Sequence, residues 1–184
     1  MDRRSRKRRG NEAQLAALYE SYYDRISRYA FVRLGNQADA EELAGEVFLR
    51  ALESLDSYKE RGVPMQAWLF RIAHNLIVDH YRKVKNQKTV SVDTVSIEAE
   101  SDPEKQAMMG FEVTRVKRAL GRLTESQRKV IELRFFGGLT SEEAGQVLKK
   151  RPGAVRELQS AAIKALRNLL NEEQSLKNGA NGAR

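Results

Sequence analysis

The sequence predicts an all-α protein made of two small helical domains joined by a flexible linker, with a helix-turn-helix as the second domain. The chain has 184 residues, enough for one ordinary domain or two small ones. It contains only three prolines and twelve glycines, while 32% of its residues are charged, which favours solvated helix faces over turn-rich β structure. Apolar residues also recur at steps of three and four along most of the chain.

Charge is distributed unevenly along the chain. Residues 1–10 form a basic arm of net charge +5, which we expect to be disordered. Residues 11–85 carry −1, the polar stretch 86–111 carries −3, residues 112–170 carry +7, and the tail 171–184 is neutral. The stretch 86–111 lacks helical periodicity, so we interpret it as an acidic flexible linker. The strongly basic second domain favours nucleic acid as a partner.

Composition excludes several classes of site. Because the chain has no cysteine, disulfides, thiolate nucleophiles and cysteine zinc sites are ruled out. No run of roughly eighteen apolar residues occurs, so we expect a cytoplasmic chain without membrane insertion. His74 and His80 are six residues apart, which puts them on different faces of a helix with no third ligand. The sequence therefore predicts no metal site, no cofactor and no catalytic residues.

Two amphipathic helices open the first domain. The apolar pattern of the first helix continues toward Leu34, after which Gly35 and Asn36 interrupt it. We expect the second helix to begin at Asp39, with Glu42 as its capping partner. Carboxylates in a first turn favour the helix dipole. That role explains two of the acids in this segment well and Glu46 poorly. The acids are Asp39, Glu41, Glu42 and Glu46.

A third helix follows a loop at 56–64 and has two different faces. Its apolar stripe begins at Trp68 and reaches Ile77. The opposite face carries Asn75, Val78, Asp79 and Arg82. The polar groups of this row suit hydrogen bonding to base edges. An ordinary solvated face with an Asp79–Arg82 ion pair explains the same row.

The second domain has the pattern of a helix-turn-helix. Capping-box sequences at Thr124–Gln127 and Thr140–Glu143 each precede a helix. A basic turn at 149–153 then leads into a longer final helix. In that arrangement the start of the final helix enters the major groove. The residues expected near DNA are Arg151, Arg156, Gln159, Ser160 and, further along, Lys164.

Three segments in order resemble the ECF (extracytoplasmic function) type of bacterial RNA polymerase sigma factor. DAEELAGEVF at 39–48 resembles the polymerase-binding region, and WLFRIAHNLIVDHYRK at 68–83 resembles the region that melts and recognises the −10 element. LTSEEAGQVLKKRPGAVRELQSAAIKAL at 139–166 resembles the reader of the −35 element. The resemblance covers roughly residues 11–170. The sequence departs from the family at Ala144-Gly145, where family members usually carry an Ile-Ala pair. The smaller side chains imply either closer packing or a weaker helix at these positions.

The resemblance implies three sets of functional residues. The set that docks on the β′ clamp helices of core RNA polymerase is Asp39, Glu41, Glu42, Leu43 and Glu46. The set that engages the −10 element is Tyr58, Arg61, Trp68, Asn75, Asp79 and Arg82. The set that binds the −35 duplex is Arg151, Arg156, Gln159, Ser160 and Lys164.

The resemblance also implies a function and partners. It implies a sigma factor without bond chemistry, associated with the nucleoid through polymerase, whose partners are promoter DNA, the β′ clamp helices, the β flap and an anti-sigma factor. A stand-alone helix-turn-helix regulator fits the second domain almost as well. The first domain distinguishes the two, since residues 11–85 show no α/β receiver pattern. A nuclease using Asp79 with a histidine lacks a third convergent ligand.

Overall fold

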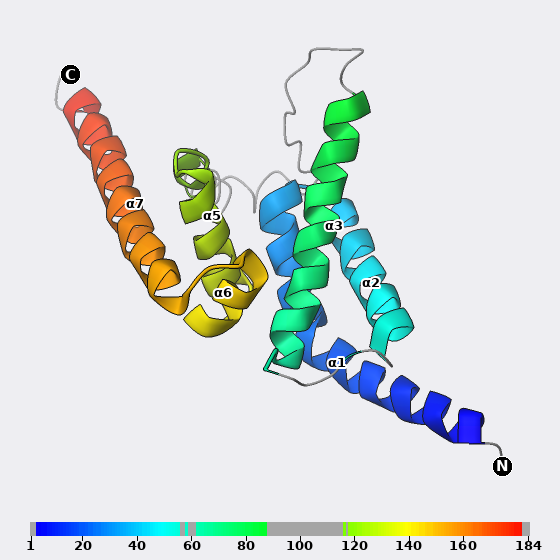
Figure 1. Ribbon diagram of the computed structural model, residues 1–184. Coiled ribbons are helices and arrows are strands. Elements are labelled where there is room, and N and C mark those ends of the chain that lie inside the picture. Colours follow the sequence, from blue (N-terminus) through cyan, green and yellow to red (C-terminus); the bar gives the residue numbers. More distant parts are fainter. Residues whose placement is uncertain (1–2, 56–57, 59–61, 88–115, 117, 182–184) are drawn as a thin grey trace.

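The computed structural model describes residues 3–55, 58, 62–87, 116 and 118–181, and every regular element in these ranges is helical (Figure 1). The first domain consists of α1 (Arg3–Leu34), α2 (Gln37–Ser54) and α3 (Met65–Gln87). In the second domain, a short helical segment at 118–121 precedes the main elements. These are α5 (Glu125–Ile131), the π-helical turn η3 (Glu132–Phe136), α6 (Ser141–Leu148) and α7 (Pro152–Asn181).

The first domain is a three-helix bundle whose core comes from the apolar stripes of all three helices. Ile26 and Tyr29 of α1, Val47 of α2, and Phe70 and Ile77 of α3 are fully buried. The rings of Tyr29 and Phe70 lie 5.6 Å apart and tilted by 59°, an arrangement that aromatic pairs favour. The bundle therefore fixes the outward faces of α2 and α3, where the candidate site residues lie.

Both predicted capping boxes of the second domain are present. The side chains of Thr124 and Thr140 accept hydrogen bonds from the N–H groups of Gln127 and Glu143, whose own side chains accept in return from the threonine N–H groups. Between these caps, α5 passes into η3, a π-helical turn that the sequence analysis did not predict. Helix α6 ends at Lys149, which has the left-handed conformation (φ 54°), and α7 then begins at Pro152.

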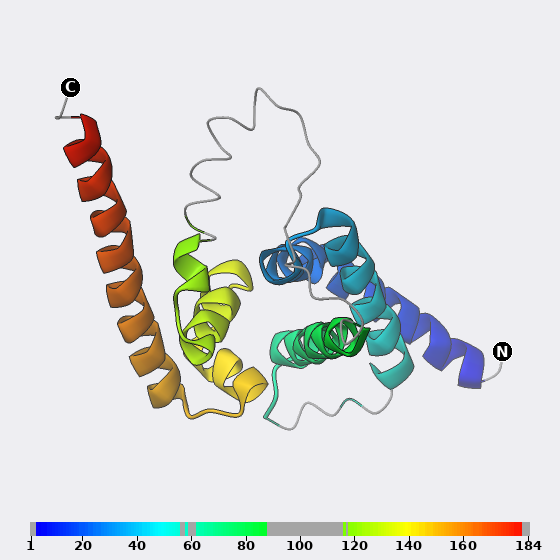
Figure 2. The ribbon, with the colours of Figure 1, turned by 90° about the horizontal axis from the view of Figure 1, so that it is seen from above.

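The two domains pack directly on each other. Tyr29 and Phe70 of the first domain belong to the same buried apolar cluster as Val130, Leu133 and Leu139 of the second. Helices α1 and α3 contact η3 and α6, and α6 lies between α3 and α7 in both views (Figures 1 and 2). The sequence predicts two domains but does not predict this shared core.

The structure differs from the sequence-based expectations at several helix ends. Helix α1 begins at Arg3, so the basic arm is helical from there instead of disordered, and it projects away from the bundle (Figure 1). Helix α7 continues to Asn181 through most of the expected tail. Extending an existing helix needs no new nucleation, and Lys and Arg are good helix formers. Helix α3 includes residues 86–87, and the rest of the expected linker lies outside the described residues.

The start of α2 also differs from the prediction. Asn36, and not Asp39, is the N-cap: its side chain accepts hydrogen bonds from the backbone N–H groups of Ala38 and Asp39. The side chain of Asp39 therefore lies within the first helical turn and does not cap the helix. Within the described residues, no helix combines the length and the apolar character needed to span a bilayer.

Candidate nucleic-acid interface

The polar row on α3 lies on its solvent face. Asn75 and Val78 are exposed, whereas Asp79 is half-buried and Arg82 is largely exposed. A guanidinium nitrogen of Arg82 lies 3.1 Å from a carboxylate oxygen of Asp79, so the predicted ion pair forms. An exposed i,i+3 pair contributes only a few tenths of a kcal/mol. The row therefore presents amide, carboxylate and guanidinium groups that bundle packing does not use.

Two aromatic side chains hold the loop that precedes α3 against the first turn of that helix. The ring of Tyr58 lies 4.9 Å from that of Trp68, and the Tyr58 hydroxyl donates a 2.6 Å hydrogen bond to the carbonyl oxygen of Val63. Trp68 is half-buried and packs against the core, so it anchors the chain that leads into the helix. Arg61, the remaining candidate in this loop, lies outside the described residues.

The acidic face of α2 is open to solvent. Glu41 and Glu42 are exposed, and Asp39 and Glu46 are half-buried. Two of these acids have neighbours on their own helix, since Glu41 accepts a 2.5 Å hydrogen bond from Gln37 and Glu46 lies 2.7 Å from Arg50. Because Asn36 caps the helix, capping does not account for these carboxylates. Leu43, which belongs to the same candidate set, is 8% exposed and forms part of the core.

Four of the five residues predicted to bind the −35 duplex are exposed on α7 or just before it. Arg151 is exposed just before the helix, and Arg156, Ser160 and Lys164 are exposed at successive steps of four, which places these three on one helix face. Arg156 lies 3.3 Å from Glu142 of α6. Gln159, the fifth candidate, is half-buried, and its side-chain oxygen accepts a 2.8 Å hydrogen bond from Arg134. The side-chain oxygen of Gln159 is therefore already used in a hydrogen bond within the second domain.

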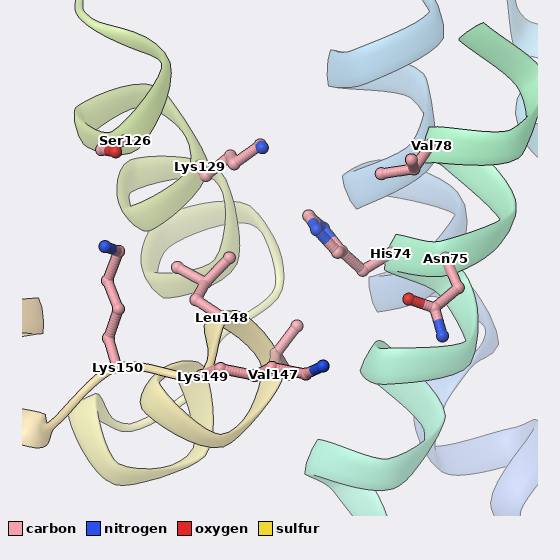
Figure 3. A pocket seen from close by; sticks show the side chains of 9 residues that line it. All are labelled: His74, Asn75, Val78, Ser126, Lys129, Val147, Leu148, Lys149 and Lys150. Carbon is pink, nitrogen blue, oxygen red and sulfur yellow. The ribbon is translucent and has the colours of Figure 1, made fainter. Parts of the chain in front are cut away.

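A cleft of about 390 Å³ separates the polar row of α3 from the helix-turn-helix (Figure 3). His74 and Asn75 project from α3 on one side, and Lys149 and Lys150 lie on the other (Figure 3). The remaining lining residues are Val78, Ser126, Lys129, Val147 and Leu148. The described residues hold no group of three His, Cys, Asp or Glu side chains placed to bind a metal ion.

His74 is held in its neutral form at this cleft. Its Nδ1 atom lies 3.0 Å from the hydroxyl oxygen of the buried Tyr29. Burial, and then the positive charges of Arg33 and Lys129, lower the pKa of His74 from 6.5 to about 4. An imidazolium is thus disfavoured beside the lysines of the second domain.

An ion pair across the two domains is a feature that the sequence analysis missed. A guanidinium nitrogen of Arg33 in α1 lies 2.8 Å from a carboxylate oxygen of Glu132 in η3, and the two side chains are only 10% and 3% exposed. Burial raises the pKa of Glu132, and the nearby Arg33 opposes this shift. The one signal in the sequence is that Glu132, like Arg134, interrupts the otherwise apolar stretch Val130–Phe136, which does not by itself identify a partner 99 residues away.

Two sequence profiles match the two domains. Sigma-70 region 2 matches residues 18–87, which include the acidic face of α2 and the polar row of α3. Sigma-70, region 4 matches residues 119–168, which include the helix-turn-helix.

Known proteins resemble the whole arrangement. The ECF RNA polymerase sigma factor ShbA of Streptomyces griseus is 35% identical over 137 residues, covering 72% of this chain and 72% of ShbA. The ECF RNA polymerase sigma factor BldN of Streptomyces coelicolor is 32% identical over 89% of this chain, which spans only 63% of BldN. The solved structure of the sigma factor RpoE, in complex with the anti-sigma factor NepR from Bartonella quintana, shares the fold. Its TM-score is 0.65 at 23% identity, covering 86% of this chain and 97% of that one. With both regions present in order, this chain belongs to the family of ECF RNA polymerase sigma factors.

Proposed function

We propose that this chain is a sigma factor that binds core RNA polymerase and directs promoter-specific initiation. It reads the −35 element as duplex through α7 and opens and holds the −10 non-template strand through α3. The observation that carries the proposal is that one chain presents an exposed acidic face on α2, an exposed polar row on α3 and an exposed basic face on α7. A stand-alone DNA-binding regulator has no need of the first two surfaces.

The acidic face of α2 supports docking on polymerase. Exposed carboxylates complement a basic surface, such as the β′ clamp helices that this family uses, and charge complementarity increases both association rate and specificity. Leu49 and Leu52, on the same helix, are 60% and 39% exposed. Apolar groups beside charged ones are typical of protein interfaces, so these leucines supply contact area that the carboxylates alone lack.

The row on α3 supports engagement of unpaired bases. Bases in a single strand expose their Watson–Crick edges and can accept or donate hydrogen bonds to amide, carboxylate and guanidinium groups. Asn75 and Arg82 offer such groups at the surface, and Trp68, whose ring packs on that of Tyr58, lies in the first turn of the same helix. The Watson–Crick edges are paired inside a closed duplex, so contact with them requires strand opening, which is part of the proposed function.

The basic face of α7 supports binding to the −35 duplex. Arg156 and Lys164 lie on the same helix face as Ser160, two cations with a hydroxyl between them. Such a face contacts phosphates and base edges when a recognition helix enters the major groove. The second domain is also proposed to meet the β flap of polymerase. Phe135 of the second domain is 58% exposed and supplies an apolar side chain for that contact.

The remaining parts of the proposal concern regulation and location. We propose that an anti-sigma factor restrains this chain, as NepR is bound to RpoE in the similar structure. The chain performs no bond chemistry in this account and works in the cytoplasm, associated with the nucleoid through polymerase.

The experiment is size-exclusion chromatography of the purified chain with bacterial core RNA polymerase at moderate salt. We expect the wild-type chain to co-elute and the variant Glu42→Lys with Glu46→Lys to elute free, because it reverses two charges on the docking face. Glu53→Lys is the matched control, since Glu53 is an exposed acid near the end of the same helix. Co-elution of the double variant at the wild-type level would refute this docking face.

A further inference from the structure

The walls of the cleft in Figure 3 are held in place by polar contacts between the two domains. Arg25 of α1 donates through Nε to the carbonyl oxygen of Gly137 at 3.1 Å, and through Nη2 to that of Gly138 at 2.9 Å. The buried Arg33–Glu132 pair joins α1 to η3. A cleft of about 390 Å³ with fixed walls has the size of pockets that hold small molecules.

The cleft carries a net positive charge. Of the nine described residues that line it, three are lysines and none is acidic. Lys129 projects from α5 toward His74, and Lys149 and Lys150 lie in the turn after α6 (Figure 3). The carboxylate of Glu125, 2.5 Å from the Lys129 ammonium, offsets part of this charge from outside the lining. The remaining positive charge favours an anionic ligand.

Lys149 has a backbone conformation that lysine rarely adopts. Its φ is 54°, and no other non-glycine residue in the described part of the chain has a positive φ. A helix often ends in a left-handed residue, but glycine is usual there because a Cβ atom raises the energy of that conformation. Backbone strain of this kind is concentrated at ligand sites. Lysine at this position costs conformational energy and places an ammonium group at the cleft.

Two neutral groups at the cleft can donate hydrogen bonds to an anion. Burial raises the pKa of Tyr29, so its hydroxyl keeps its proton and can donate to Nδ1 of His74, 3.0 Å away. The neutral His74 ring then carries its own proton on Nε2, and this ring projects into the cleft (Figure 3). Ser126, in the first turn of α5, adds a hydroxyl group.

The rest of the lining suits a ring with polar edges. Val78 of α3 faces Val147 and Leu148 of α6 across the cleft, which gives an apolar surface on each wall (Figure 3). The amide of Asn75 both donates and accepts hydrogen bonds, as the edge of a nucleobase requires. The described lining contains lysines and no arginine. Lysine binds phosphate as a point charge, whereas arginine is favoured for paired contacts to carboxylates.

We propose that this cleft binds a nucleoside polyphosphate, with its phosphates on Lys129, Lys149 and Lys150 and its base against the apolar walls. The site shares only Asn75 with the residues proposed to bind polymerase and promoter DNA. Binding is therefore a property of the free chain, and its test does not depend on the proposed function.

The test is NMR of the histidine rings in the free chain, titrated with ATP and with GTP without divalent metal. The chain has only two histidines, so His74 reports on the cleft and His80, which is outside the lining, is an internal control. Pyrophosphate and adenosine are titrated separately, all at constant ionic strength. Phosphate charge offsets the positive charges of Arg33 and Lys129, which lower the pKa of His74.

The proposal predicts a saturable shift of the His74 signal with ATP or GTP, a higher pKa of His74 in the complex, and no shift of His80. Lys149→Asn removes the charge but tolerates the left-handed conformation, and it should weaken binding about five-fold or more. Lys149→Arg keeps the charge and should bind as wild type does. Lys83→Gln, an exposed lysine of α3 outside the cleft, is the matched control and should also bind normally. Pyrophosphate and adenosine should each bind more weakly than the nucleotides.

Three other results would overturn the proposal. An unmoved His74 signal with both nucleotides at several millimolar would show that the cleft does not bind them. Equal affinities for Lys149→Asn and Lys83→Gln would show that the cleft lysines do not hold the phosphates. Pyrophosphate binding as tightly as ATP and GTP would show that the base adds nothing, which contradicts a nucleoside site. Failure to co-elute with core polymerase would refute the proposed function and leave these results unchanged.

Discussion

The pH dependence of folding should report directly on His74. Its pKa is lowered in the folded chain from 6.5 to about 4, mainly by burial and then by the charges of Arg33 and Lys129. A lowered histidine pKa means that the unfolded chain binds a proton more readily than the folded chain does. The stabilisation is therefore fully present above pH 6.5 and is lost as the pH falls toward 4.

The magnitude follows from these two pKa values. Between pH 7 and pH 5 the unfolded imidazole becomes almost fully protonated, whereas the folded one stays mostly neutral. The linked free energy of unfolding falls by at most about 2 kcal/mol over that range, an upper figure because the ring keeps some contact with solvent. That is a large share of the stability of a small domain.

Urea unfolding followed by circular dichroism at pH 7 and pH 5 measures the effect. His74→Gln removes the titrating group while keeping a side chain able to hydrogen-bond the Tyr29 hydroxyl. The wild-type chain should lose up to about 2 kcal/mol more than His74→Gln between the two pH values. His80→Gln, on the same helix, should lose as much as wild type because His74 is intact. Equal losses in wild type and His74→Gln would refute the reasoning.

Four further outcomes are expected. Asn75→Ala with Asp79→Ala should reduce open-complex formation in permanganate footprinting without weakening core binding; normal opening would remove both residues from the −10 site. Arg156→Ala should lower the slope of log affinity against log salt for −35 duplex by about one in fluorescence anisotropy, and an unchanged slope argues against a phosphate contact. Gly145→Ala should destabilise the chain by about 1–3 kcal/mol in urea, because its Cβ would lie 2.6 Å from the Lys150 carbonyl oxygen. Gly45→Ala, where nothing lies within 4 Å, should instead stabilise it by up to about 1 kcal/mol, and the opposite order would contradict both assignments.

Features encoded by neighbouring residues could be predicted from the sequence. The capping boxes at Thr124 and Thr140 need only residues three positions apart, and both are present. The Asp79–Arg82 pair forms at the predicted spacing. At Gly145, where the family usually carries alanine, the structure shows close packing. The backbone of the turn at Lys150 fills the space that a side chain at position 145 would need. Helical periodicity likewise identified the buried stripes, because one face of each helix packs inward.

Features that depend on distant residues could not be predicted. Arg25 and Arg33 look like ordinary charges on an amphipathic helix, and only the fold reveals their partners more than 90 residues away. Gln159 stays a predicted DNA contact, and its hydrogen bond from Arg134 is a second feature that only the fold reveals. The start of α2 was misplaced for a local reason: Asn36 and Asp39 are both good N-caps, and the propensities do not decide between them.

The measurement that tests the central claim most directly is run-off transcription from a promoter library by bacterial core RNA polymerase with and without this chain. The account predicts new start sites that share −35 and −10 motifs and that disappear with Glu42→Lys and Glu46→Lys. Duplex binding by the chain alone, with no new start sites and no co-elution with polymerase, would contradict it and favour a stand-alone DNA-binding regulator.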